Sequence, residues 1–400
     1  MRVLFLTQVL PYPLDAGPKV RAYYVLRRLV EAGHEVTLVS FTRDEDNGRS
    51  LAHLLSICRE VQTVPIRRTA IREGFAILKS AVGRTPFLIA RDEFSQMKKK
   101  IKSLISSNSF DVIHADQLWM APYAVRYSAV TKTVLDQHNA VFQVPDRMAY
   151  AEANPLKRLL YGQEARKMQP YERKLCEQFD HVVWVSEDER RLFQNGTGNQ
   201  RTGSQATVIP ICVDPETQAA LQRVRKPHRV TFMGGMHWPP NAQGIEWFAR
   251  EIWPQISRQI PEAVLTVIGK NPPKILFEQG AIEATGYVVD PVDYLKETAV
   301  FIVPLLAGGG MRVKILHAWC WQLPVVSTRI GAEGLVTRNG TTIFLADSAA
   351  DFEDGVVQVF RDSDRAESLA KQGRLEVENS YNWRKVYRDW EGVYQCVYSS

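Results

Sequence analysis

Apolar runs of strand length alternate with helix-like segments along this chain, and that alternation restricts the possible folds more than any other feature. Residues 2–8 ("RVLFLTQ") are almost continuously apolar, as expected for a parallel strand that is buried on both faces of its sheet. An amphipathic helix follows from residue 20, Gly33 is its stop, and a second strand-like run comes next. Because this order repeats downstream, the sequence predicts an α/β sheet wound by right-handed crossovers.

The strand-and-helix pattern starts again at "RVTFMGGM", residues 229–236. The sequence therefore predicts two doubly wound, Rossmann-like domains, 1–220 and 221–383. In such sheets ligands bind outside the carboxyl ends of the strands. The glycines that follow strand-like runs are therefore candidates for ligand contact, and they are Gly17, Gly234, Gly235, Gly269, Gly308, Gly309 and Gly310.

Composition supports an ordinary globular protein of about two domains, with 400 residues, 45% hydrophobic and 24% charged. No apolar run approaches the roughly 20 residues that span a bilayer. The five cysteines form neither a metal-ligand spacing nor a disulfide framework, which predicts a cytoplasmic protein; they are Cys58, Cys176, Cys212, Cys320 and Cys396.

The net charge of +6 arises in the first part of the chain. Residues 1–220 contain 30 Lys and Arg against 24 Asp and Glu, whereas 221–400 contain 20 of each. A basic half suits an anionic membrane, a phosphorylated substrate or nucleic acid, or it serves solubility alone. Since no nucleic-acid-binding motif is visible, we expect no nucleic-acid partner. Peripheral contact with the inner face of a membrane stays open.

The stretch "LLAGGGMRVKILHAWC", residues 305–320, combines three glycines with two cations and a predicted helix start. Backbone N–H groups at glycine can approach a ligand closely, and a helix N-terminus favours negative charge. With Arg312 and Lys314 this pattern indicates a phosphate site. The alternative is a flexible loop with two solvated basic residues.

Three blocks give the chain a resemblance to a known family. They are "LPYPLDAGPKVRAYYVLRRLVEAGHEVTLVSF", "FMGGMHWPPNAQGIEWFAREIWP" and "VFIVPLLAGGGMRVKILHAWCWQLPVVSTRIGAEGL", followed by "SYNWRKV" near the end. In this order they resemble the retaining GT-B glycosyltransferases of family 4, also called group 1. The resemblance implies two Rossmann-like domains facing across a cleft and a last helix, 384–400, that packs back on the first domain. It also implies transfer of the hexosyltransferase type from a nucleotide-diphosphate sugar, with no further cofactor and no metal.

The resemblance places the donor mainly on the second domain and the acceptor on the first. The acceptor would be a glycan, a lipid-linked sugar or a small glycoside. Arg312, Lys314 and His138 then become catalytic candidates, the two cations at the departing diphosphate and His138 at the sugar. Asp136 and Asn139 flank His138 and could orient it or meet the acceptor, and His114 has a weaker claim. The remaining donor-binding candidates are Gly17, Gly234, Gly235, Gly269, Lys270, Val288, Gly308, Gly309, Gly310, His317 and Glu333.

Each of these residues also has a structural interpretation. The arginine and the lysine could form surface salt bridges, the glycines could serve tight turns, Lys270 could be exposed, and a lone histidine at a strand end is often structural.

The chain departs from the family pattern at His317, where a glutamate usually holds the ribose hydroxyls. The first glutamate of the usual pair falls on Gly309. A carboxylate accepts two hydroxyl hydrogen bonds, but neutral imidazole has one acceptor nitrogen. Glu333 could supply a carboxylate nearby. Besides an active glycosyltransferase, we therefore keep two alternatives, a nucleotide-binding scaffold without turnover and another nucleotide-sugar enzyme such as an epimerase or phosphorylase.

Overall fold

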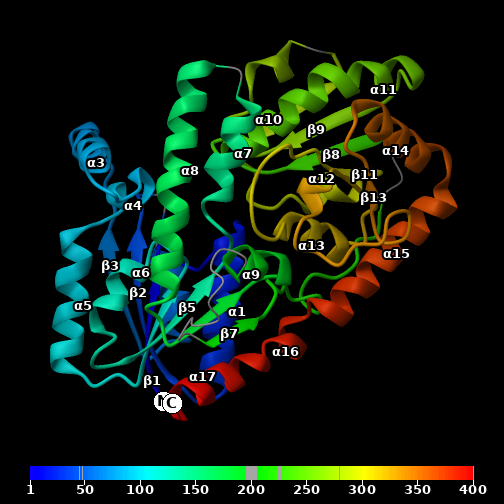
Figure 1. The fold of residues 1–400 in the computed structure, drawn as a ribbon. Helices are drawn as coiled ribbons and strands as arrows, with labels where there is room; N and C mark the ends of the chain where they lie inside the picture. The colour runs from blue at the N-terminus through cyan, green and yellow to red at the C-terminus, as the bar shows by residue number, and fades with distance from the viewer. Residues whose placement is uncertain are drawn as a thin grey trace. The chain divides into compact units, whose positions relative to one another are not determined.

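The protein forms two compact units, each built on its own parallel sheet (Figure 1). The computed structural model describes residues 1–44, 46, 48–152, 154–194, 205–223, 228–278 and 280–399. Unit 1 comprises Met1–Cys212, Gly309–Met311 and Trp383–Ser400; unit 2 comprises Val213–Gly308 and Arg312–Asn382. The units thus divide before the expected position at 220, and three residues of the Gly-rich loop belong to unit 1.

The sheet of unit 1 has seven strands in the order β3-β2-β1-β4-β5-β6-β7, and all neighbours are parallel. Its strands are β1 (Arg2–Thr7), β2 (Glu35–Thr42), β3 (Glu60–Pro65), β4 (Val112–Asp116), β5 (Lys132–Gln137), β6 (His181–Trp184) and β7 (Gln205–Val208). Central strand β1 pairs with β2 on one side and with β4 on the other. The strand order therefore reverses between β1 and β4, which is the point where ligands bind in such sheets.

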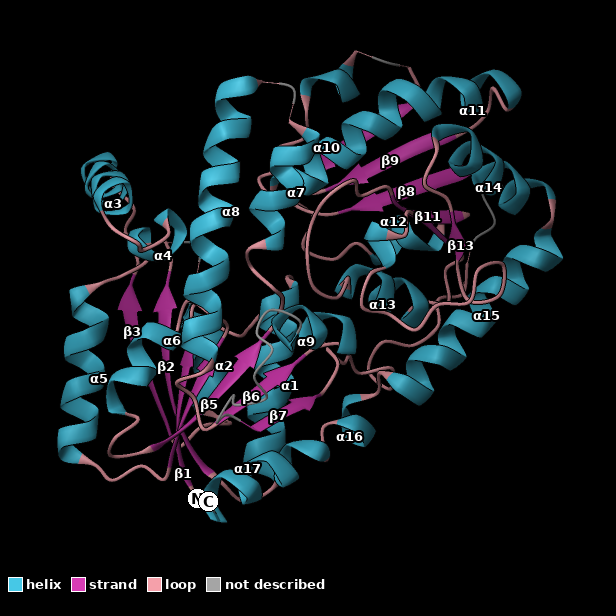
Figure 2. Ribbon diagram, viewed as in Figure 1, coloured by secondary structure: helices cyan, strands magenta, loops and turns pink. Residues whose placement is uncertain are grey.

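Helices cover both faces of this sheet (Figure 2). They are α1 (Gly17–Glu31), α2 (Gly48–Leu55), α3 (Ala70–Val82), α4 (Phe87–Arg91), α5 (Ser95–Ser107), α6 (Ala121–Ala124), η1 (Val125–Tyr127), α7 (Gln143–Ala151), α8 (Pro155–Cys176), α9 (Glu187–Gln194), α16 (Trp383–Val386) and α17 (Asp389–Ser399). Helix α1 ends just before Gly33, whose φ of 82° is the left-handed value that glycine adopts easily. The C-terminal helix α17 contacts α1 and β5.

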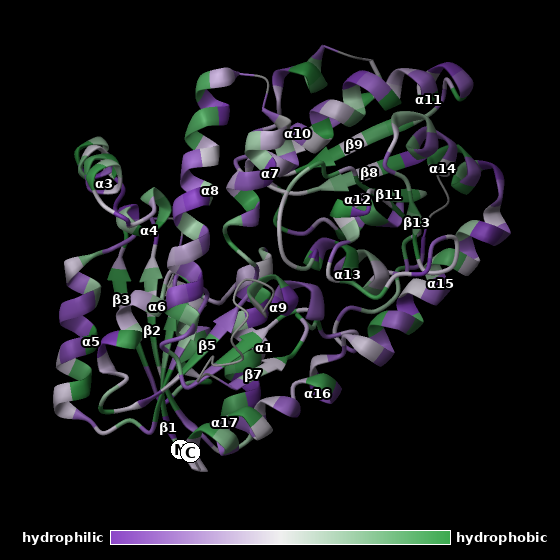
Figure 3. Cartoon of the chain, in the orientation of Figure 1, coloured by the Kyte–Doolittle hydropathy of each residue, from purple (hydrophilic) through white to green (hydrophobic). Residues whose placement is uncertain are grey.

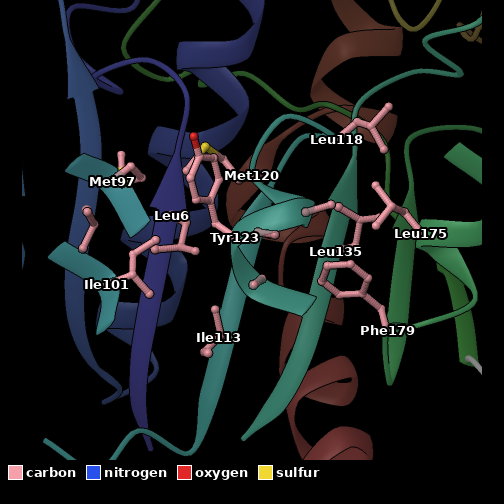
Figure 4. Close-up of a cluster of buried hydrophobic side chains, with 14 of the residues drawn as sticks. Leu6, Met97, Ile101, Ile113, Leu118, Met120, Tyr123, Leu135, Leu175 and Phe179 are labelled. Atoms are coloured by element: carbon pink, nitrogen blue, oxygen red, sulfur yellow. The ribbon is translucent and has the colours of Figure 1, made fainter. Parts of the chain in front are cut away.

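The core of unit 1 follows the two-residue period of its strands. Leu6 and Ile113 point toward α5 and α6, where they meet Met97, Ile101 and Tyr123 (Figure 4). On the other face, the Phe5 ring stacks on His114, which lies against Trp390 and Tyr394 of α17. Both faces are therefore buried, as the continuous apolar character of residues 2–8 predicts.

The sheet of unit 2 has six parallel strands in the order β10-β9-β8-β11-β12-β13. The strands are β8 (Arg229–Met233), β9 (Val264–Ile268), β10 (Ile282–Gly286), β11 (Val300–Val303), β12 (Val325–Ser327) and β13 (Phe344–Leu345). Around them lie α10 (Pro239–Trp247), η2 (Phe248–Ile252), α11 (Trp253–Gln259), η3 (Lys274–Phe277), α12 (Val292–Lys296), α13 (Val313–Cys320), η4 (Ile330–Ala332), α14 (Ala349–Arg361) and α15 (Ser363–Ser380). Here the order reverses between β8 and β11.

The helical segment that spans residues 239–259 is interrupted in the structure. It begins at Pro239, passes through a π-helical turn at Phe248–Ile252 and continues as α11. Pro254 has no N–H to donate to the carbonyl four residues back, so the regular hydrogen-bond ladder cannot run through it. The apolar side of the composite helix still reaches the core, since Ile245, Phe248 and Ile256 are fully buried.

Candidate active site

A buried ion pair lies beneath the carboxyl ends of β4 and β5 in unit 1. Arg21 of α1 holds the Asp136 carboxylate with two hydrogen bonds, Nε to Oδ2 and Nη2 to Oδ1, each 2.9 Å long. The same guanidinium donates to the Pro210 carbonyl and lies 5.1 Å from the ring centroid of Tyr387. Burial would raise the pKa of Asp136, but the Arg21 charge outweighs burial and holds that pKa well below its usual range.

His138 joins this ion pair directly after β5. Its Nε2 lies 2.9 Å from Oδ1 of Asp116 and 3.6 Å from Oδ2 of Asp136. Burial alone would lower the pKa of His138, but the two carboxylates outweigh it and raise that pKa to about 9. His138 is therefore a cation at neutral pH. Nε2 is thus the ring nitrogen that faces the carboxylates, and Nδ1 is the other protonated nitrogen of the cation.

We expect the stability advantage of wild type over His138→Gln to depend on pH. A pKa raised from 6.5 to about 9 stabilises the fold fully below pH 6.5, and this contribution is lost as the pH rises through about 9. The difference in unfolding free energy is on the order of 3 kcal/mol. Urea unfolding of both proteins from pH 6 to pH 9.5 measures it. Parallel stability curves would contradict the raised pKa.

Two buried glutamates fix the loop that follows β5. Glu172 of α8 accepts hydrogen bonds from the backbone N–H groups of Val141 and Phe142, at 2.8 and 3.1 Å. Glu189 of α9 accepts from the Ala140 N–H and, at 2.8 Å, from the Gly310 N–H. The tip of the Gly-rich loop is thus tied to the loop that carries His138.

The other predicted residues of unit 1 surround this network. Gly17 is the first residue of α1, and Asn139 is the half-buried neighbour of His138. A Cβ at Gly310 would come within 2.6 Å of the His138 carbonyl oxygen, and φ there is 74°, so this position requires glycine. His114 is fully buried and its Nδ1 bonds the Tyr394 hydroxyl at 2.8 Å, which favours the structural interpretation of this histidine.

In unit 2, Arg312 lies directly before α13 and folds back over the Gly-rich loop. Its side chain is buried, with the guanidinium carbon 5.9 Å from the Trp238 ring centroid and Nη2 3.4 Å from the Ile330 carbonyl. A Cβ at Gly308 would lie 2.5 Å from Nη2 of Arg312, and φ at Gly308 is 135°. The glycine therefore makes room for the arginine, and Arg312 is buried rather than at the surface.

Lys314, two residues further and in the first turn of α13, is held against the loop that follows β8 and the start of α10. Its Nζ donates to Oδ1 of Asn241 at 2.8 Å and lies 4.5 Å from the Phe232 ring centroid. A Cβ at Gly234 would come within 2.8 Å of this Nζ and within 2.7 Å of the Asn241 amide nitrogen. Burial, and secondly the charge of Arg312, lowers the pKa of Lys314 to about 7. A bound anion beside Nζ would raise the pKa of Lys314 again and so favour its protonated form.

The remaining predicted residues of unit 2 also follow strand ends. Gly235 accepts from the Asn241 amide through its carbonyl, at 2.9 Å. Gly269 packs its Cα against the Gly234 carbonyl so closely that a side chain would overlap it, and its φ is 151°. Lys270 is exposed, with Nζ 4.9 Å from the Tyr287 ring centroid, and Val288 is half-buried just after β10.

His317 lies in the second turn of α13, and its Nδ1 is 2.8 Å from Oε1 of Gln218. Since that amide oxygen is an acceptor, Nδ1 carries the proton and Nε2 presents a lone pair. Burial lowers the pKa of His317 to about 4, so the ring is neutral at physiological pH. Glu333 directly follows η4, the short segment after β12.

The structure therefore gathers the predicted residues into two sets, one in each unit. Sequence reasoning missed the partners that hold them, namely Arg21, Asp116, Glu189 and Asn241. Arg21 had a detectable signal, because a charged residue occupies a position on the apolar face of the predicted helix. The roles of Glu189 and Asn241 had no such signal, since each depends on a contact made by folding.

Solved structures with a similar fold confirm the predicted GT-B architecture. Sucrose-phosphate synthase from Thermosynechococcus elongatus superposes with a TM-score of 0.72 at 15% identity and full coverage of both chains. Anabaena HepE, solved in complex with UDP and glucose, gives a TM-score of 0.68 at 12% identity, with 99% of each chain covered.

Two family models match the chain and identify its glycosyltransferase family. Residues 16–217 match Glycosyltransferase Family 4 and residues 227–362 match Glycosyl transferases group 1. The chain belongs to Glycosyltransferase Family 4 and is a sugar-transferring enzyme. A 44.6 kDa protein in the cps region of Klebsiella pneumoniae is 22% identical, with 96% of this chain and 98% of the relative covered. The capsular polysaccharide biosynthesis glycosyltransferase CapM of Staphylococcus aureus is 23% identical over 35% of each chain.

Proposed function

We propose that the enzyme transfers a sugar from a nucleoside-diphosphate sugar to an acceptor hydroxyl, with retention and without a divalent metal. The observation that carries the proposal is the placement of two basic side chains beside the glycine loops of unit 2, Arg312 against Gly308 and Lys314 against Gly234. Both follow a strand end near the point where the order of the sheet reverses, which is where such sheets bind ligands. A buried arginine, a lysine that a bound anion would protonate and glycine backbone together suit a diphosphate.

In the proposed reaction the bond between the anomeric carbon and the diphosphate oxygen breaks while the acceptor oxygen attacks from the same face. The acceptor proton passes to the departing phosphate oxygen, so atoms and charge balance. Arg312 and Lys314 stabilise the negative charge that develops on the diphosphate. Nδ1 of His138 donates a hydrogen bond to a sugar hydroxyl. An inverted product would exclude this mechanism.

We propose a donor of the uridine diphosphate class and an acceptor that belongs to a cell-envelope polysaccharide, either free or lipid-linked. Supporting the donor, HepE was solved with UDP-glucose. A mutant of Staphylococcus aureus TarM, which has a similar fold with a TM-score of 0.68 at 10% identity, was solved with UDP and α-GlcNAc-glycerol. The acceptor class is supported by CapM and by the Klebsiella relative from the cps region. The basic first half adds peripheral contact with an anionic membrane to the proposal.

Metal independence is proposed from the charges of unit 1. His114, Asp116 and Asp136 place ligand atoms within 4.8 Å of one another, a distance at which they could hold a metal ion. However, Arg21 holds both oxygens of Asp136, and the cationic His138 is bonded to Asp116. A divalent ion would have to displace or approach two positive groups, which disfavours it. EDTA is therefore expected to leave turnover unchanged.

The deciding experiment is a thermal-shift panel of nucleoside diphosphates on wild type and on His317→Glu. We expect UDP to stabilise wild type, by about 2.7 kcal/mol at a hundredfold excess over its Kd. The variant should bind UDP up to about tenfold more tightly, because a carboxylate accepts a second ribose hydroxyl. Gln322→Glu, on the turn after the same helix, is the matched charge control.

Three results would redirect the proposal. A UDP shift that appears only in His317→Glu would favour the scaffold without turnover. A free epimerised sugar nucleotide would indicate an epimerase. Phosphate-dependent cleavage of a glycoside would indicate a phosphorylase.

A further inference from the structure

Helix α3 carries an apolar stripe that points away from unit 1. Its members recur at intervals of four, three and four residues, so they lie on one face of the helix. They are Ile71, Phe75, Leu78 and Val82, with exposed fractions of 74%, 68%, 59% and 85%. Only Ala76 and Ser80 of α3 are buried, on the opposite face. Figure 3 shows α3 as a largely hydrophobic helix beyond the end of the sheet.

This orientation is the reverse of an ordinary surface helix, which turns its apolar face to the core. Contacts on the polar side hold the helix in place. The Arg72 guanidinium lies 4.0 Å from the Phe94 ring centroid, and its Nη2 donates to the Glu93 carbonyl at 3.1 Å. Lys167 of α8 donates to the Ser80 carbonyl. A continuous apolar stripe held outward in this way marks an interaction surface.

Charge around the stripe indicates what covers it. Residues 66–84 contain five basic side chains and one acidic side chain, Glu73, which gives a net charge of +4. The basic ones are Arg67, Arg68, Arg72, Lys79 and Arg84. Arg68 and Lys79 are paired with Asp92 and Glu93, whereas Arg67 and Arg84, which lie beyond opposite ends of α3, are exposed. A second copy of the chain would bring the same positive charges against them. An anionic surface would instead complement them.

The start of α8 repeats the same combination. Leu156, Leu159 and Leu160 are exposed, and Lys157 and Arg158 lie between them. In Figure 1 both α3 and this part of α8 extend beyond the carboxyl ends of β2 and β3. None of the described helices combines the length and the apolar character that a membrane span requires.

We propose that unit 1 docks on an anionic lipid bilayer through α3, with the start of α8 as a second contact. Helix α3 would lie in the plane of the interface, its apolar stripe at the acyl boundary and the flanking Arg67 and Arg84 at the lipid phosphates. The docking proposal names the surface that would make the membrane contact of the proposed function. It rests on the proposed function in one respect only, because a membrane-bound acceptor gives the enzyme a reason to work at a membrane.

The test is co-sedimentation with vesicles of mixed phosphatidylglycerol and phosphatidylcholine, and with vesicles of phosphatidylcholine alone. Wild type should bind the mixed vesicles and bind the neutral ones far less. The triple variant Ile71→Gln, Phe75→Gln, Leu78→Gln should lose at least about tenfold in partitioning, since binding scales with inserted apolar area. Its matched control replaces three exposed apolar residues of unit 2, Phe277→Gln, Val289→Gln and Val336→Gln, and should bind like wild type.

Two double variants that remove positive charge test whether basic residues contribute to the docking. Arg67→Gln with Arg84→Gln should weaken binding to the mixed vesicles several-fold, whereas Lys274→Gln with Lys371→Gln should not. The UDP thermal shift, measured on every variant, should stay at the wild-type value. The UDP thermal shift reports donor binding, and co-sedimentation reports membrane docking. A variant can lose one of these activities and keep the other, so the two proposals are tested separately.

Three outcomes would overturn the docking proposal. In the first, wild type does not bind the mixed vesicles. In the second, the triple variant binds them as wild type does. In the third, the triple variant converts a wild-type dimer into a monomer without any vesicle binding, which would identify the stripe as a self-association face.

Discussion

Replacing Arg312 with glutamine is expected to lower kcat about 100-fold or more and to change KM much less. Charge on the departing diphosphate develops in the transition state, so a cation aimed at it acts on turnover rather than on ground-state binding. The buried guanidinium is already positioned by Trp238, Ile330 and the space at Gly308. It therefore needs little reorganisation when the charge appears.

The kinetic measurement uses the donor that the nucleotide panel identifies. Arg312→Lys keeps the charge but not the planar fork, and an intermediate loss is expected. Arg329→Gln is the matched control, since Arg329 lies on the surface of the same unit in an exposed pair with Asp347. The melting temperature of each variant shows whether it is folded. A folded Arg312→Gln variant with nearly unchanged kcat would remove Arg312 from the mechanism.

Replacing Arg21 with methionine is expected to cost about 3–5 kcal/mol of unfolding free energy. Both side chains of the Arg21–Asp136 pair are fully buried, and the change would leave the Asp136 carboxylate without its bidentate partner. The Tyr387 hydroxyl and the Pro210 carbonyl would also lose a donor. The loss therefore combines an uncompensated charge with unmade hydrogen bonds.

Urea unfolding of three variants checks this expectation. The double variant Arg21→Met with Asp136→Asn removes both charges and should recover a large part of the loss. Arg27→Met is the matched control on the same helix, because its exposed pair with Glu31 should contribute less than about 1 kcal/mol. If Arg21→Met were as stable as Arg27→Met, the buried ion pair would not hold α1 to β5.

Much of the fold followed from local sequence. The central strands are apolar on both faces and the helices between them are amphipathic, so their alternation identified two parallel sheets. Edge strand β3 was missed, because most of Glu60–Pro65 is only partly buried and shows no apolar run. The π-helical turn before Pro254 was missed as well. The spacing of apolar residues does not reveal that the backbone hydrogen bonds of one turn shift by one residue.

The candidate site divides in the same way. The Gly-rich loop, Arg312 and Lys314 are contiguous, so one sequence motif revealed them together. The environment of His138 was invisible, since Arg21 and Asp136 are 115 residues apart in the chain. Glu189 and Gly310 are 121 residues apart. Such contacts exist only after the strand order has brought distant segments to one edge of the sheet.

Helix α3 is a case in which the sequence pattern is clear but its orientation in the fold is not predictable. Amphipathic spacing is a property of the sequence, and Ile71, Phe75 and Leu78 display it plainly. Spacing alone would have placed this apolar face against the core. Which side of an amphipathic helix turns inward is decided by tertiary contacts, here the packing of Arg72 on Phe94 and the bond from Lys167 to Ser80. The sequence by itself determined the two sheets and the phosphate-type loop, and only the tertiary structure decided the charge state of His138 and the outward face of α3.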